Sequence, residues 1–274
     1  MSRWLITGCS TGLGRALAEE ALTQGHSVVV TARDAESISA LVARFPETAI
    51  GIALDVTDER AIADAVQAAN DRFGGVDVLV NNAGYGFRSA VEEADLGDVE
   101  RLFDTNVFGP VSLMQRVLPG MRARRSGVIV NISSIAARWM PAGSGFYAAT
   151  KSALEGISGS LRKEVAPLGI AVIAIEPGGF RTDFAGRSLT QSAAAIGDYA
   201  ETAGKRRIEN DTVDGTQPGD PRKAAKAIIV LVESADPPQL VTLGSDALNG
   251  FRDALTQQLA DADRWAELST GTDF

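Results

Sequence analysis

Short apolar runs alternate with longer helical stretches along most of the chain, and this alternation constrains the fold more than any other feature. The runs lie at residues 4–7, 27–32, 50–54, 76–80, 128–132, 170–175 and 240–243. Continuous apolar runs are typical of parallel strands buried on both faces, and right-handed crossovers then give a doubly wound sheet. The sequence predicts an α/β fold, a single-domain Rossmann architecture with a parallel sheet of about seven strands and helices on both faces.

Domain organisation follows from the same rhythm. The 274 residues contain no Pro/Gly/Ser-rich linker between two cores, so we expect one domain over residues 1–274. After Pro177 the rhythm stops, and residues 180–219 predict a flexible, partly helical flap. Residues 245–268 predict a terminal amphipathic helix, and Thr57 is expected to cap the helix that ends near Phe73.

Charge and residue usage exclude several classes of protein. The net charge of −9 argues against binding to nucleic acid or to an anionic membrane. A single cysteine, Cys9, excludes an internal disulfide, and we expect no metal site. No apolar run approaches membrane-spanning length, and the first strand leaves no room for a signal peptide. We expect a cytoplasmic protein, with its only histidine, His26, at the surface.

A glycine-rich loop, TGCSTGLG at residues 7–14, joins the first strand to the first helix. Small residues there let the backbone approach a pyrophosphate, whose charge the helix start favours. A tight turn needing positive φ would explain one or two of the glycines, but not three at this spacing. The expected cofactor-binding residues of this loop are Gly8, Ser10, Thr11, Gly12, Leu13 and Gly14.

The end of the second strand bears on which dinucleotide is bound. An acidic residue there holds a ribose 2′-OH, whereas a basic residue accommodates a 2′-phosphate. With Ala32 at that position, Arg33 lies beside the 2′-phosphate and Asp34 caps the following helix, which predicts NADP(H). A shift of one residue would give the site to Asp34 and favour NAD(H).

Tyr147 and Lys151 lie four residues apart on a predicted helix, so they share a face. A phenol with a pKa near 10 is a poor base at neutral pH, and a neighbouring cation lowers that pKa. Ser133 and Ser134 end a strand, at the edge where doubly wound sheets bind ligands. The spacing of Tyr147 and Lys151 alone does not show that the pair is functional, because a tyrosine and a lysine often lie four residues apart by chance.

The order of several motifs is more specific. TGCSTGLG, NNAG at residues 81–84, Asn106 in TNVFG, Ser134, YAATK at residues 147–151 and PGGFRTDF from Pro177 follow one another. Together they resemble the short-chain dehydrogenase/reductase family, in its short single-domain branch, over about residues 3–182. The opening loop and the TARD segment resemble the hydroxysteroid and retinol dehydrogenases of that family.

The resemblance implies four catalytic residues. Tyr147 would act as general acid or base, and Lys151 would lower the pKa of Tyr147 and bind the nicotinamide ribose. Ser134 would orient the substrate oxygen; it is favoured over Ser133 because the family serine lies thirteen residues before the tyrosine. Asn106 would hold a water in a proton relay.

The resemblance also implies cofactor contacts at three further strand ends. They are Asp55 and Val56 at the adenine, Asn82, Ala83 and Gly84 at the adenosine ribose and central sheet, and Pro177, Gly178 and Thr182 near the nicotinamide. The alternative is a structural role for Asn82 and a turn or cap for the others.

The sequence therefore predicts an oxidoreductase that transfers hydride between NADP(H) and a hydrophobic carbonyl or secondary alcohol. The alternatives are a 3-oxoacyl-thioester reductase and a catalytically silent NADP(H)-binding sensor or scaffold. Apolar side chains that could line the substrate cleft are Tyr85, Phe87, Trp139, Met140, Phe180, Phe184, Leu189 and Tyr199. The segment LVTLGSDALNGFRDAL departs from the Gly-Gly pair that ends many tetrameric members, so either a homodimer or a homotetramer is expected.

Overall fold

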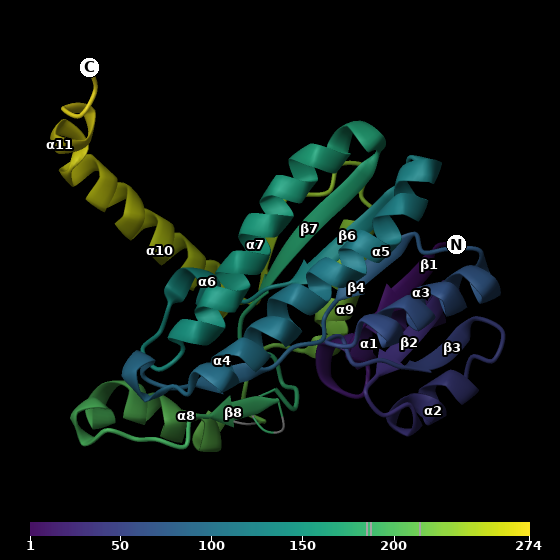
Figure 1. The fold of residues 1–274 in the computed structure, drawn as a ribbon, viewed down its shortest axis with the longest axis horizontal. Helices are drawn as coiled ribbons and strands as arrows, with labels where there is room; N and C mark the ends of the chain where they lie inside the picture. The colour runs from purple at the N-terminus through teal and green to yellow at the C-terminus, as the bar shows by residue number, and fades with distance from the viewer. Residues whose placement is uncertain (185, 187, 214) are drawn as a thin grey trace.

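A twisted parallel sheet runs through the centre of the molecule (Figure 1). The computed structural model describes residues 1–184, 186, 188–213 and 215–274. Within these residues the sheet has seven strands in the order β3-β2-β1-β4-β6-β7-β9, and all neighbours are parallel. The strands are β1 Arg3–Ile6, β2 Ser27–Ala32, β3 Ala49–Ala53, β4 Val78–Asn81, β6 Gly127–Ile132, β7 Ile170–Pro177 and β9 Leu240–Leu243.

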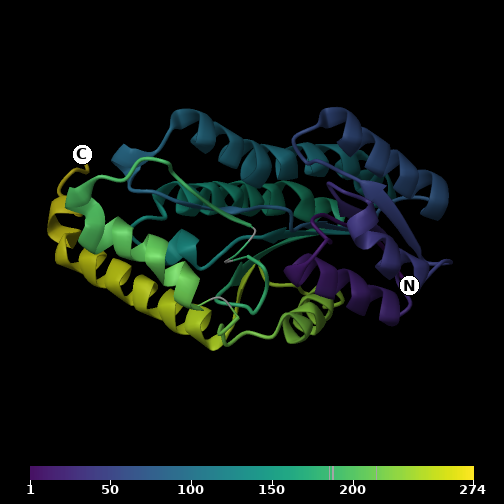
Figure 2. The ribbon, with the colours of Figure 1, turned by 90° about the horizontal axis from the view of Figure 1, so that it is seen from below.

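Helices cover both faces of this sheet, as Figure 2 shows from below. One face packs against α1 Gly12–Thr23, α2 Glu36–Ala43 and α9 Pro221–Val232. The other packs against α3 Glu59–Phe73, α5 Gly109–Arg124 and α7 Gly145–Val165. Successive strand residues serve opposite faces, so Trp4 and Ile6 belong to one core and Leu5 to the other. The predicted doubly wound α/β architecture is confirmed.

Two helix starts differ from the sequence prediction. The N-cap of α3 is Asp58, whose carboxylate accepts hydrogen bonds from the amides of Arg60 and Ala61, so the prediction of Thr57 was wrong. Both residue types cap well, and the sequence alone does not separate them. Asp34 accepts from the Glu36 amide at the start of α2, although the cap position itself falls on Ala35.

The chain over residues 96–124 forms an interrupted helix. It consists of α4 Leu96–Phe103, a π-helical turn η2 Asp104–Phe108, and α5. π-turns inside helices are rare and often occur at functional sites. This turn carries Asn106.

The predicted flap contains regular structure in its described part. It comprises β8 Leu189–Gln191, the short turns η4 Gly197–Tyr199 and η5 Ala200–Gly204, and α8 Lys205–Val213. Strand β8 pairs in parallel with β5 Gly86–Arg88, which forms a second, two-stranded sheet that the sequence pattern does not predict. Ala185, Arg187 and Asp214 lie outside the described residues. The remaining short elements are η1 Val91–Glu93, α6 Ala136–Trp139 and η3 Ala166–Leu168.

The predicted C-terminal helix is two helices, α10 Ser245–Arg264 and α11 Ala266–Thr270. Helix α10 leaves the sheet near α6 and projects away from the rest of the molecule (Figure 1). Among the described residues, no helix is both long and apolar enough to cross a membrane.

His26 is buried, so the prediction of a surface position was wrong. The residue is 7% exposed, and its ring lies 5.6 Å from the centre of the Trp4 ring and accepts a 3.2 Å hydrogen bond from the Ser2 amide. The turn brings the imidazole under the N-terminal segment, a tertiary contact that local sequence does not encode.

Candidate active site

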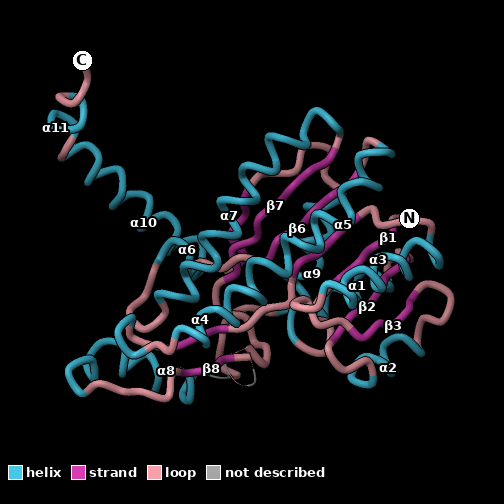
Figure 3. Tube along the Cα trace, in the orientation of Figure 1, coloured by secondary structure: helices cyan, strands magenta, loops and turns pink. Residues whose placement is uncertain are grey.

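A cleft of about 960 Å³ lies at the carboxyl ends of the central strands. The loops that leave the strands at this edge run toward β8 and α8 (Figure 3). Nearly all of the site residues expected from the sequence line it. They are Gly8, Ser10, Thr11, Gly12, Leu13, Arg33, Asp55, Val56, Asn82, Ala83, Gly84, Ser134, Tyr147, Lys151, Pro177, Gly178 and Thr182. Gly14 and Asn106 are the two expected residues that are not among its lining.

The glycine-rich loop is closely packed from behind. A Cβ on Gly14 would lie 2.3 Å from Asn82 Nδ2 and 2.5 Å from the Gly8 carbonyl oxygen, so this position excludes a side chain. Asn82 Nδ2 donates to the carbonyl oxygens of Thr7, at 2.8 Å, and Gly8, at 3.1 Å. Gly8 and Gly12 have φ values of +71° and +62°. Asn82 therefore braces the loop, and the exposed small residues leave a backbone surface that suits a pyrophosphate.

The side chains of Arg33 and Asp34 lie in different places. Arg33 is exposed and lines the cleft, whereas Asp34 is not among the lining residues. The Asp34 carboxylate is used at the start of α2, where it lies 3.0 Å from the Glu36 amide nitrogen. At the next strand end, Asp55 accepts from both the amide and the hydroxyl of Thr57, at 2.9 and 2.7 Å. Asp55 therefore forms a local turn, which is the structural alternative to a contact with the adenine.

Tyr147 lies on the first turn of α7 and is 6% exposed. Burial raises the pKa of Tyr147, while hydrogen bonding with Ser134 and the charge of Arg88 lower it. Lys151 Nζ lies 5.7 Å from the centre of the Tyr147 ring and donates to the Ile132 carbonyl at 2.9 Å. In this arrangement the ammonium donates to the strand rather than to the phenol, and the expected lowering of the Tyr147 pKa by Lys151 stays a prediction.

Lys151 is itself unusual because it is 5% exposed. Burial lowers the pKa of Lys151 to about 8, and the charge of Glu155, one turn further along α7, opposes this shift. A lysine with a pKa near neutrality can give up or take a proton during a reaction. This property suits a group that exchanges protons within the cleft.

The two candidate serines have separate partners. Ser134 Oγ accepts a 3.1 Å hydrogen bond from the Ala136 amide, and its hydroxyl is close enough to Tyr147 to influence the phenol. Ser133 Oγ donates to Glu155 at 2.5 Å. Because the Ser133 hydroxyl is committed to a carboxylate, the geometry favours Ser134 as the residue that contacts a reacting oxygen.

Asn106 lies behind Gly84 and is 1% exposed. Its amide nitrogen donates to the Tyr85 carbonyl and to Thr150 Oγ1, at 2.9 and 3.2 Å, and its oxygen accepts from the Tyr85 amide at 3.1 Å. A Cβ on Gly84 would meet Asn106 Oδ1 at 2.9 Å and Lys151 Nζ at 3.6 Å, so Asn106 and Lys151 converge there. Its water-holding role stays a prediction.

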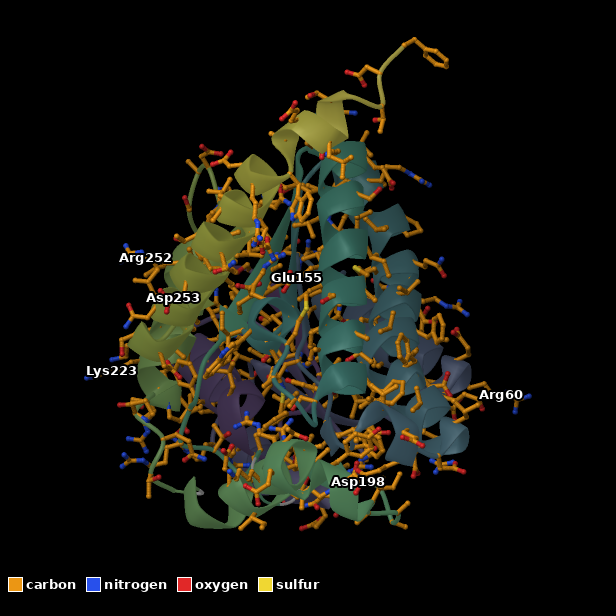
Figure 4. The ribbon with its side chains drawn as sticks, turned by 90° about the vertical axis from the view of Figure 1, so that its left-hand side faces the viewer. Arg60, Glu155, Asp198, Lys223, Arg252 and Asp253 are labelled. Atoms are coloured by element: carbon orange, nitrogen blue, oxygen red, sulfur yellow. The ribbon has the colours of Figure 1, made fainter. Side chains whose placement is uncertain are left out.

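A buried acid cluster behind Lys151 was not expected from the sequence. Arg138 donates to Glu155 at 2.5 Å and to Glu176 at 2.9 Å, and the Glu176 side chain is fully buried. Burial and the neighbouring Glu155 raise the pKa of Glu176 to about 8. Figure 4 shows Glu155 near the centre of the molecule and Arg60, Asp198 and Arg252 at its periphery. The four-residue spacing of Lys151 and Glu155 on one helix is the feature of the sequence that could have pointed to this cluster.

The lining of the cleft near the flap, residues 180–219, is less apolar than the sequence predicts. Six of the expected side chains line it, namely Tyr85, Phe87, Trp139, Phe180, Phe184 and Leu189. Met140 and Tyr199 do not, and the Tyr199 hydroxyl instead donates to Glu92 at 2.6 Å. Arg88, Ser144 and Arg206 also line this end, and the sequence did not single them out.

Comparisons with known proteins agree with this fold. The family model described as short chain dehydrogenase matches residues 3–193. Oxidoreductase BOA17 of Botryotinia fuckeliana is 37% identical over 273 residues, which cover 97% of each chain. A short-chain dehydrogenase structure from Streptomyces avermitilis has 42% identity and a TM-score of 0.93, with all of both chains covered. A structure of ElxO with NADP bound has 27% identity and a TM-score of 0.75, covering 91% of this chain and 100% of that one.

Proposed function

The chain belongs to the short-chain dehydrogenase family, and on that premise we propose that it transfers hydride between NADP(H) and a carbonyl or secondary alcohol on an apolar skeleton. As a member of this family it is an oxidoreductase that uses a nicotinamide cofactor. The position of Tyr147, in the cleft beside Ser134 and one helical turn before Lys151, supports this proposal most strongly.

Tyr147 is the proton donor and acceptor of the proposed reaction. When a carbonyl is reduced, the phenol donates its proton to the substrate oxygen, and when an alcohol is oxidised the phenolate takes that proton back. Ser134 hydrogen-bonds the same oxygen and orients it. Lys151 exchanges a proton with the far side of the site, which its pKa of about 8 allows. A bound nicotinamide supplies or accepts the hydride.

The proposed preference for NADP(H) rests on Arg33. Its exposed guanidinium lines the cleft at the end of β2, where a basic residue can pair with a 2′-phosphate. Asp34, which would favour NAD(H) in the other register, is engaged at the start of α2. The related ElxO structure with NADP bound supports the same assignment.

The apolar skeleton is inferred from the cleft wall. Phe184 packs against the Tyr147 ring with 5.8 Å between ring centres, and Phe87 and Leu189 lie on the two strands of the small sheet. A substrate that reaches Tyr147 therefore passes aromatic and aliphatic side chains. We expect ketones with a hydrophobic body to be better substrates than small polar aldehydes.

The assay for this proposal follows consumption of NADPH with ketones, aldehydes, steroids and 3-oxoacyl thioesters. Turnover of hydrophobic ketones supports the proposal, and selective turnover of the thioesters would replace it with the 3-oxoacyl reductase alternative. Tight NADPH binding without turnover of any substrate would contradict catalysis and favour a sensor or scaffold.

The cofactor half of the proposal has its own test. Arg33→Ala should raise the KM for NADPH about tenfold or more and leave the KM for NADH nearly unchanged, because only NADPH carries the 2′-phosphate. Arg44→Ala, which changes an exposed arginine at the end of α2 outside the cleft lining, is the control. An unchanged NADPH/NADH ratio in Arg33→Ala would remove Arg33 from the assignment.

A further inference from the structure

Arg88, the last residue of β5, is a buried cation at the flap end of the cleft. Its side chain lines the cleft, the residue is 7% exposed, and Nη1 donates to Ser144 Oγ at 2.7 Å. Within the residues that the structure describes, Nε has no hydrogen-bond partner and no carboxylate forms an ion pair with Arg88. Buried guanidinium groups are normally paired, so this one calls for an anion.

Glu209, the acid whose charge acts on Arg88, and Glu93, five residues further along the chain than Arg88, already have other partners. Glu93 accepts from Arg207 at 2.6 Å and from the amides of Ala90 and Ile196. Glu209 pairs with Arg206 at 2.8 Å, so the second arginine of the cleft end is neutralised by its own partner. Burial lowers the pKa of Arg88 to about 10, which leaves the guanidinium charged at neutral pH.

The contact of Arg88 with the start of α7 makes its charge more costly. Its hydrogen-bond acceptor, Ser144, is the N-cap residue of this 21-residue helix, and no described side chain caps the helix there. The N-terminus of a helix carries partial positive charge, which repels a cation and attracts an anion. Tyr147 follows Ser144 by less than one turn, so an anion held here lies next to the proposed reacting centre.

The backbone around Arg88 is held on both sides. The Arg88 carbonyl accepts from the Ser192 amide of the flap at 3.0 Å, and the Ser89 amide donates to Gly143 at 3.0 Å. Strand pairing sets Arg88 opposite Gln191, which also lines the cleft. The guanidinium is therefore presented from a fixed strand, which favours selective binding.

We propose that Arg88 binds a carboxylate of the substrate, so that the preferred substrates are oxo acids or hydroxy acids with an apolar skeleton. This deepens the proposed function and rests on it. A guanidinium pairs with a carboxylate through two parallel hydrogen bonds. In the described part of this end of the cleft, Glu209 neutralises Arg206, which leaves the positive charge of Arg88 without an acidic partner. One positive charge matches a carboxylate monoanion better than a phosphate dianion.

The first test measures binding to the protein saturated with NADP⁺, with benzoate, benzamide and phenyl phosphate as probes in calorimetry. Benzoate should bind about tenfold or more tightly than benzamide, and Arg88→Gln should abolish the difference. Arg101→Gln, an exposed cleft-lining arginine paired with Asp98, should retain it. Equal binding of benzoate and benzamide would overturn the proposal, and a preference for phenyl phosphate would replace the carboxylate with a phosphate.

The second test compares turnover of an oxo acid with that of its methyl ester. Wild type should favour the acid in kcat/KM by about 100-fold, and Arg88→Gln should lose that preference because kcat/KM falls much more for the acid than for the ester. If Arg88→Gln lowered kcat/KM equally for the acid and the ester and shifted the pH profile, Arg88 would act by tuning the pKa of Tyr147. That result would contradict carboxylate binding. Failure of both substrates, with benzoate selectivity intact, would count against the proposed hydride transfer and leave the anion site standing.

Discussion

At the scale of single residues, burial decides which charged groups of the site have shifted pKa values. Lys151, Glu176 and Arg88 are all nearly inaccessible, and in each the largest cause of the shift is loss of contact with water. Their partners then differ: Lys151 faces Glu155, Glu176 shares Arg138 with Glu155, and Arg88 contacts a serine. The titration behaviour of the site therefore depends on packing as much as on sequence.

Glu176 gives a pH prediction. Because its pKa is raised to about 8, the folded state holds a proton that the unfolded state releases at its ordinary pKa of 4.5. Its contribution to stability is full below the unfolded pKa and is lost as the pH rises through the folded pKa. Glu176→Gln should therefore show a smaller fall in Tm than wild type between about pH 5 and about pH 7.5.

The control for this prediction is Glu164→Gln, at an exposed position on α7. Thermal unfolding of the three proteins across the pH range is sufficient. A fall in Tm of the same size in Glu176→Gln and wild type would mean that Glu176 is already ionised when buried.

Residues differ in how far the sequence could reveal them. Tyr147, Lys151 and Ser134 were selected from spacing and motif order, and all three line the cleft. Arg88 and Glu176 could not be selected in this way. What distinguishes Arg88 and Glu176 is their burial and the partners that the fold brings to them, and neither property can be read from the local sequence.

At the scale of elements, hydrophobic periodicity predicted the strands of the main sheet well. Apolar strands in a parallel sheet have one environment on both faces, so their sequence signal is continuous. The π-turn at residues 104–108 and the β5–β8 pairing were missed. Both depend on contacts outside the element, such as Asn106 with Tyr85, rather than on any period of the sequence.

The start of α3 provides a prediction at this scale. Asp58→Ala removes the acceptor of two amide hydrogen bonds and should lower the free energy of unfolding by about 1 kcal/mol. Thr57→Ala, the residue first expected to cap the helix, should have a smaller effect. Urea unfolding of both variants compares them directly, and a larger loss in Thr57→Ala would reverse the assignment of the cap.

At the scale of the whole molecule, α10 and α11 project from the body and expose apolar side chains. Leu255, Leu259, Trp265 and Leu268 are 37%, 66%, 55% and 67% exposed. Leu255 and Leu259 share a face at helical spacing, and an isolated helix is only marginally stable in water. We propose that a second copy of the chain covers this face. The acidic balance of the chain disfavours an anionic membrane as the partner of this face.

Self-association is checked by the molar mass in solution. Leu259→Glu should lower the molar mass measured by light scattering, because it places a charge on the paired face. Gln257→Glu, an exposed position on the same helix, should leave it unchanged. A wild-type protein that is monomeric at micromolar concentration would contradict the proposal.

Tyr147→Phe shows whether Tyr147 exchanges the proton of the reaction. The variant keeps the ring that packs against Phe184 and removes only the hydroxyl. On the best substrate of the panel, kcat should fall by about 100- to 10,000-fold while the Kd for NADPH stays close to that of wild type. A kcat near that of wild type would contradict the account.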